Sequence, residues 1–131
     1  DDFKNSLNFS NVNFLGRVEN YIESLSNCNV LLSPHPEHSH IVASKTKILE
    51  AGACQMAVLT SESGGLGFPD DLLLIAKSKK DFIEKLTYLE DNKARNSLGK
   101  DLRLEISKNY NTETEIIKLL KLYDEFLPQI P

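Results

Sequence analysis

The chain has 131 residues, a length that suits one domain over residues 1–131 with its own hydrophobic core. Its net charge of −4 and its scattered lysines form no basic patch of the kind that nucleic-acid-binding proteins carry, so we expect no nucleic-acid partner. The apolar runs are too short to span a membrane, we expect no secretory leader, and two isolated cysteines favour buried free thiols of a cytoplasmic protein over a disulfide.

The first sixty residues alternate short apolar runs with helical patterns. Residues 11–16 (NVNFLG) predict a strand that ends in glycine, and residues 19–26 predict a helix with its apolar side chains on one face. Residues 29–32 predict a buried strand, because this apolar run is closed by a Ser-Pro turn. Residues 45–54 predict a helix capped by the preceding serine, and residues 56–60 predict a third strand.

The second half adds one strand and three helices. Residues 61–65 (SESGG) predict a flexible polar loop, and residues 72–76 predict a fourth strand. The helix starts are expected at Ser78 with Asp81, at Asn92 as a cap, and at Thr112 with Glu115, the last helix being stopped by Pro128. Strands that alternate with helices predict an α/β fold, a Rossmann-like parallel sheet flanked by helices on both faces.

In a parallel sheet of this kind, ligands bind beyond the carboxyl ends of the strands. Three segments follow predicted strands and are therefore expected at this edge: Gly16-Arg17, the histidine-rich loop after residue 32, and Ser61–Gly65. The topology alone predicts that these segments converge.

The loop SPHPEHSH (residues 33–40) contains all three histidines of the chain, His35, His38 and His40, together with Glu37. These residues have the nitrogen and oxygen ligands that zinc prefers. However, two prolines stiffen the loop, and no regular element aims the rings at one point. We therefore expect no metal site and favour a loop that lines a ligand pocket; a solvent loop without a role stays open.

Three stretches resemble the retaining glycosyltransferases of the GT-B fold (family 4, glycosyl transferases group 1). NVNFLGRVENYIESLSNCNVLLSP is similar to that family's V-x-F-x-G, helix, a-d-V-x-x-x-P-S pattern. KTKILEAGACQMAVLTSESGG resembles K-x-x-E-A-M-A-C-G-x-P-V-V-A-T-x-x-G-G, and the stretch from Leu86 to Tyr123 resembles the C-terminal signature. The stretches occur in the family's order and cover most of the chain from Asn11 onward.

The resemblance implies the nucleotide-sugar-binding, C-terminal domain of a two-domain transferase, with a UDP-, GDP- or other NDP-sugar as donor and no cofactor. It implies that Glu50 accepts hydrogen bonds from the ribose hydroxyls and that Lys47, one turn earlier, meets a phosphate. It also implies that the backbone of Gly64 and Gly65 approaches the diphosphate, and that Gly16 and Arg17 lie along the base.

The sequence departs from the family pattern at the first catalytic-site glutamate. Glu37 stands thirteen positions before Glu50, where the family has a spacing of eight. The catalytic residue is therefore unknown, and Glu37, as a contact to the donor sugar, is the one candidate for it. Gln55 and Ala57 also replace the usual glycine and proline. The family's opening strand-helix-strand portion, with its G-R-x-x-x-K-G motif, has no counterpart before Asn11.

These departures predict a fragment or a split part of a two-domain enzyme that is inactive by itself. Its partners would be the donor and an N-terminal acceptor-binding domain in the same or another chain; peripheral membrane contact of the full enzyme stays open. The full enzyme would transfer a sugar with retention. A non-catalytic nucleotide- or partner-binding module of the same fold is the alternative, and a nucleotide-sugar epimerase is a third possibility.

Overall fold

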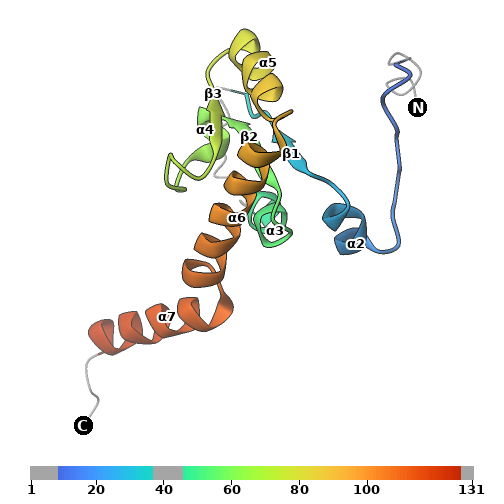
Figure 1. The fold of residues 1–131 in the computed structure, drawn as a ribbon. Helices are drawn as coiled ribbons and strands as arrows, with labels where there is room; N and C mark the ends of the chain where they lie inside the picture. The colour runs from blue at the N-terminus through green and yellow to red at the C-terminus, as the bar shows by residue number, and fades with distance from the viewer. Residues whose placement is uncertain (1–8, 37–45, 128–131) are drawn as a thin grey trace.

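The computed structural model of the protein describes residues 9–36 and 46–127. Figure 1 shows short strands at the centre, helices around them and a last helix that extends from the body. The elements are, in chain order, α2 (Tyr21–Ser26), β1 (Val30–Ser33), α3 (Thr46–Ala53), β2 (Ala57–Ser61), α4 (Glu62–Gly65), β3 (Leu74–Ala76), α5 (Lys79–Tyr88), α6 (Asn92–Asn109) and α7 (Thr112–Phe126).

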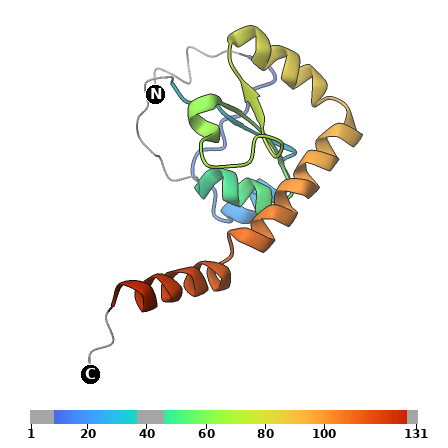
Figure 2. The ribbon, with the colours of Figure 1, turned by 90° about the vertical axis from the view of Figure 1, so that its left-hand side faces the viewer.

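The three strands form a parallel sheet in the order β1-β2-β3. Val30 pairs with Ala57 at the start of the first ladder, and Leu59 pairs with Leu74 at the start of the second. Helices lie around this small sheet when it is viewed from two sides (Figures 1 and 2). The predicted α/β, Rossmann-like sheet flanked by helices is therefore confirmed.

Two core clusters form on opposite faces of β2, because successive side chains of a strand point to opposite faces. Val58 belongs to a cluster with residues of α3 and of the second half of α6. Ala57 and Leu59 belong to the other cluster, which is completed by Leu89 at the end of α5 and by Leu98 of α6. Helix α6 thus contributes to both faces.

Residues 11–16 do not form the predicted strand. Val12, Phe14 and Leu15 of this segment are exposed, and among the described residues β1 pairs with β2 alone. A strand needs a face to bury, and the apolar side chains of residues 11–16 lie on the surface, outside the sheet of β1, β2 and β3.

Four smaller predictions also needed correction. Strand β3, predicted over residues 72–76, begins only at Leu74, because the Leu72 N–H donates to the Pro69 carbonyl at 3.2 Å in a turn. Residues 61–65 are a helical turn rather than a flexible loop. The N-cap of α6 is Asp91, one residue before the predicted cap Asn92, whereas α7 begins at Thr112 as predicted. Both cysteines are free as predicted, but Cys28 is exposed instead of buried.

Helix α3 ends in a Schellman motif. The Gln55 N–H donates to the Gly52 carbonyl at 2.8 Å, and the Met56 N–H donates to the Ala51 carbonyl at 2.9 Å. Met56 and Ala51 also meet in the first core cluster, which is the apolar contact that accompanies the motif. Gln55 has φ +62°, in the left-handed region that favours glycine.

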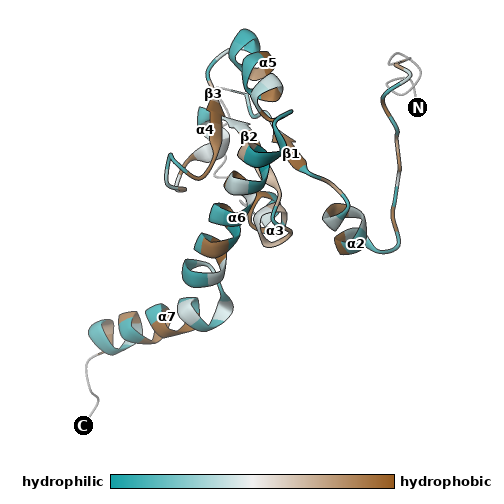
Figure 3. Ribbon diagram, in the orientation of Figure 1, coloured by the Kyte–Doolittle hydropathy of each residue, from teal (hydrophilic) through white to brown (hydrophobic). Residues whose placement is uncertain are grey.

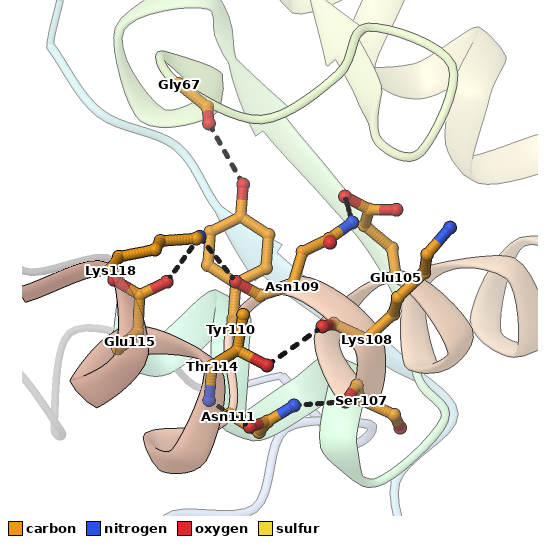
Figure 4. A network of polar contacts seen from close by, with 10 residues as sticks. All are labelled: Gly67, Glu105, Ser107, Lys108, Asn109, Tyr110, Asn111, Thr114, Glu115 and Lys118. Atoms are coloured by element: carbon orange, nitrogen blue, oxygen red, sulfur yellow. Dashed lines mark hydrogen bonds and ion pairs between the residues drawn. The ribbon is translucent and has the colours of Figure 1, made fainter. Parts of the chain in front are cut away.

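A polar network fixes the corner between α6 and α7 (Figure 4). Asn111 accepts from the Thr114 N–H at 2.8 Å and donates to the Ser107 carbonyl at 2.6 Å. The ring of Tyr110 stacks on Phe68 with centroids 5.4 Å apart, and its hydroxyl donates to the Gly67 carbonyl. The direction of α7 is therefore set by local contacts with the body of the domain.

We predict that Gln55→Gly stabilises the domain by about 1 kcal/mol, because glycine adopts the left-handed conformation without the steric cost that other residues have. Urea unfolding followed by circular dichroism measures the change. Gln55→Ala, which keeps a Cβ, is the matched control and should leave the stability near that of the wild type. If Gln55→Gly lowers the stability, Gln55 does not have a left-handed backbone conformation.

Candidate functional site

A pocket of about 330 Å³ lies at the carboxyl ends of all three strands. We call it the edge pocket. It is lined by the last residues of β2 and β3 and by residues of the segments that come after the three strands: His35, Pro36, Ser61, Glu62, Ser63, Ala76, Lys77, Ser78, Lys79 and Phe82. Ligands of parallel α/β sheets bind at this edge, so the pocket lies where topology predicts a site.

Serine hydroxyls join the loop after β1 to the end of β2. Ser61 Oγ accepts from the His35 N–H and donates to the His35 carbonyl, both at 2.9 Å. Ser63 Oγ lies 3.2 Å from Ser61 Oγ and donates to the Pro36 carbonyl at 3.3 Å. One ring nitrogen of His35, Nε2, lies 3.1 Å from Ser33 Oγ. The histidine-rich loop and the segment after β2 therefore converge, as predicted.

The glycine pair is buried in α4 and packs against the sheet. A Cβ on Gly64 would clash with Thr60 Oγ1 and His35 Cδ2, and one on Gly65 would clash with the end of the Ile75 side chain. The absence of side chains therefore lets α4 lie close against β2 and the histidine loop. This close packing is a structural reason for two glycines, beside the diphosphate role that the resemblance implies.

The start of α5 forms the other wall of the pocket. Ser78 caps the helix by accepting from the Asp81 N–H at 3.1 Å, and Asp81 accepts from the Lys77 N–H at 2.9 Å. Hydrogen bonds from Lys85 and from the Lys77 backbone hold the pKa of Asp81 below its ordinary value. The Lys77 ammonium reaches across to Glu62 at 3.4 Å, so it pairs with the opposite wall.

Glu50 lies on α3, half-buried, outside the lining of the edge pocket. The hydroxyl of Tyr21, the first residue of α2, donates to Glu50 Oε2 at 3.2 Å. Lys47 is exposed on the same helix, one turn earlier. The structure therefore places the predicted ribose carboxylate between α2 and α3.

Gly16 and Arg17 lie in the exposed segment that leads into α2. Gly16 has φ +67°, which fits the predicted turn. These two residues do not line the edge pocket, so the structure does not bring all predicted segments into one cavity.

Three residues of the histidine-rich loop, Glu37, His38 and His40, fall outside the residues that the structure describes. Within residues 9–36 and 46–127, no three His, Cys, Asp or Glu side chains are grouped so that they could hold a metal ion. The possible sugar contact of Glu37 stays a prediction.

The sequence interpretation missed the residues after the third strand, Lys77, Ser78, Lys79 and Phe82. The signal was present, because the rule that assigned Ser61–Gly65 to the carboxyl edge applies equally to the residues after Ala76. Ser78 was assigned a capping role only, and the structure shows that the same helix start also forms a pocket wall.

A family model described as glycosyl transferase-like matches residues 2–121, nearly the whole chain. The chain belongs to the glycosyl transferase-like family. It is 30% identical over 130 residues to N,N'-diacetylbacillosaminyl-diphospho-undecaprenol alpha-1,3-N-acetylgalactosaminyltransferase of Campylobacter jejuni. The match covers 95% of the chain and 33% of that relative, so the chain spans about a third of the relative's length. No solved structure gives a significant match.

Membership of the glycosyl transferase-like family confirms the resemblance to a glycosyltransferase group 1 domain. The description of the family and the name of the relative support sugar transfer as the general chemistry of this family. Within the described residues, none of the helices combines the length and the apolar character needed to cross a membrane.

We predict that Gly64→Ala lowers the free energy of unfolding by about 1–3 kcal/mol, because the new methyl group would overpack the contact with Thr60 and His35. Thermal unfolding measures the loss. Leu66→Ala, two residues later on the exposed side of the turn, should change the stability much less. Equal stability of Gly64→Ala and the wild type would contradict the packing of α4.

Proposed function

We propose that the chain is the donor-binding part of a glycosyltransferase, and that it binds a nucleoside-diphosphate sugar. The observation that carries the proposal is the position of Glu50. Glu50 is a half-buried residue on the helix that resembles the family's K-x-x-E segment, and a hydrogen bond from Tyr21 holds one of its carboxylate oxygens. A carboxylate has enough lone pairs to accept from both hydroxyls of a ribose at once.

The proposed roles follow the order of groups along a nucleotide sugar. Arg17 and the Gly16 turn would lie along the base, Glu50 would accept from the ribose, and Lys47 would meet a phosphate as a flexible positive charge. Neutralisation of the departing nucleoside diphosphate is the electrostatic task of such a site. We propose that the full enzyme retains the anomeric configuration, as the family resemblance implies.

We propose the edge pocket for the sugar end of the donor. The serine hydroxyls and the His35 ring can both donate and accept hydrogen bonds, as sugar hydroxyls do. The Phe82 ring adds an apolar surface for the C–H groups of a sugar. The pocket is small for a whole nucleotide but suits a single ring, since ligand pockets generally span about 300–1,000 Å³.

The exposed apolar side chains of α7 are an argument that this helix contacts another part of the transferase. Among the described residues, eight large apolar side chains of α7 and its cap are about half exposed or more: Ile116, Ile117, Leu119, Leu120, Leu122, Tyr123, Phe126 and Leu127. Figure 3 shows brown, hydrophobic positions between teal ones along α7. Patches of this kind mark interaction surfaces. We propose that the acceptor-binding part of the enzyme covers them.

We predict that Glu50→Gln weakens binding of UDP or GDP about tenfold to a hundredfold, because hydrogen bonds to a charged acceptor are stronger than those to a neutral amide. Isothermal calorimetry on the purified chain measures the two affinities. Glu125→Gln on exposed α7 removes the same charge away from the site and should bind normally. Wild-type protein that binds neither nucleotide would contradict the proposal.

We also predict where a bound donor perturbs the protein. UDP should shift NMR signals near Glu50 and Arg17, and UDP-N-acetylgalactosamine, chosen because the Campylobacter relative is named as an N-acetylgalactosaminyltransferase, should add shifts at His35, Ser63 and Lys79. Signals of exposed α5 residues such as Glu84 serve as the internal control. Identical shifts with both ligands would show that the edge pocket is not part of the donor site.

A further inference from the structure

The contact between Tyr21 of α2 and Glu50 of α3 joins two residues that are 29 positions apart in sequence. The Tyr21 hydroxyl donates to Glu50 Oε2 at 3.2 Å. A tyrosine ring has few rotatable bonds, so its hydroxyl occupies a defined position once the ring is anchored.

Local contacts anchor both helices. Asn20 caps α2 by accepting from the Glu23 N–H at 3.2 Å and donates to the Glu23 carboxylate at 2.9 Å. Leu25, one turn after Tyr21, packs against the first core cluster. On the other side, Ile48 and Ala51 are buried on α3 next to Glu50. The backbone positions of the two partners are therefore fixed by packing.

Among the described residues, Tyr21 is the single side chain that donates to Glu50, which leaves the carboxylate available to a ligand. An ionised carboxyl group has about four lone-pair sites, of which Tyr21 uses one. The remaining sites are enough for two ribose hydroxyls. The orientation of the carboxyl plane, which would otherwise vary by rotation of this half-buried side chain, is restrained by the tyrosine.

Tyr21 also follows Arg17 by four residues, at the end of the segment that contains the Gly16 turn. The segment proposed to lie along the base therefore leads directly into the residue that contacts the proposed ribose carboxylate. Burial, followed by the hydrogen bond and the negative charge of Glu50, raises the pKa of the Tyr21 hydroxyl, which is consistent with a donor to an ionised carboxylate.

We infer that Tyr21 is a positioning residue of the donor site, whose hydroxyl holds the Glu50 carboxylate in the orientation that receives the ribose hydroxyls. The inference rests on the proposed function, because it needs Glu50 to bind ribose. Pre-orientation of a binding group increases affinity by reducing the entropy lost when the ligand binds.

The test compares wild type, Tyr21→Phe, Glu50→Gln and the double variant in calorimetric titrations with UDP and with 2′,3′-dideoxy-UDP. Tyr21→Phe keeps the ring and should weaken UDP binding about threefold to tenfold, the size expected for one hydrogen bond. On the dideoxy nucleotide this penalty should vanish, since no ribose hydroxyl remains to be received. The two substitutions should be non-additive, because the tyrosine acts through the glutamate. Tyr88→Phe, an exposed tyrosine of α5, is the matched control and should bind like the wild type.

The outcomes separate the two claims. Wild-type binding that is lost in Glu50→Gln but unchanged in Tyr21→Phe overturns the positioning role alone. An equal penalty on both nucleotides also overturns it, because it indicates a general structural effect. Absence of nucleotide binding by the wild type, or binding unaffected by Glu50→Gln, overturns the proposed function and the inference with it.

A ligand-free measurement tests the contact itself. The ionisation of Tyr21, followed by NMR of its ring carbons, should shift to lower pH in Glu50→Gln, because the acceptor charge that opposes ionisation has been removed. A Tyr21 titration that is the same in both proteins would show that the two side chains do not interact.

Discussion

The burial of β2 on both faces is the constraint on which the rest of the domain depends. Its residues from Ala57 to Thr60 are fully buried, and neighbouring side chains of the strand enter different core clusters. Helices α3 and α6 pack on one face, and α5 closes the other. Because apolar burial is the dominant favourable contribution to folding, these two faces decide where α3, α5 and α6 lie.

Strand β2 also fixes the position of the loop after β1 at the carboxyl edge of the sheet. Thr60 is fully buried, and its hydroxyl donates to the Ser33 carbonyl at 2.7 Å, beside the end of the β1–β2 ladder. The next residue, Ser61, binds both backbone groups of His35. A buried polar group must be hydrogen-bonded, and here the partners lie on the neighbouring strand and its loop. The loop after β1 therefore starts from a defined position and forms one wall of the edge pocket.

The two parts of the proposed donor site depend on this framework in different ways. The edge pocket is a direct result of three parallel strands that end at the same edge. Glu50 depends on the packing of α3, whose end is fixed by the Schellman motif and whose buried face is set by Ile48 and Ala51. Tyr21 connects this second part to the segment before α2. Separate local structures thus position the groups that a nucleotide and a sugar would meet.

The sequence by itself determined the class of fold, most of the strands and helices in their order, the family and the carboxyl edge as the place of a site. These features follow from apolar periodicity, from caps such as Ser78 and from ordered motifs, all of which are local in the chain. Only the tertiary structure decided that residues 11–16 stay outside the described sheet with their apolar side chains exposed, that Gly64 and Gly65 belong to a packed helical turn, and that Lys77 to Phe82 form a pocket wall. It also decided that Tyr21 meets Glu50. Strand pairing and contacts between distant side chains depend on which segments lie next to each other in space, and no local pattern encodes that.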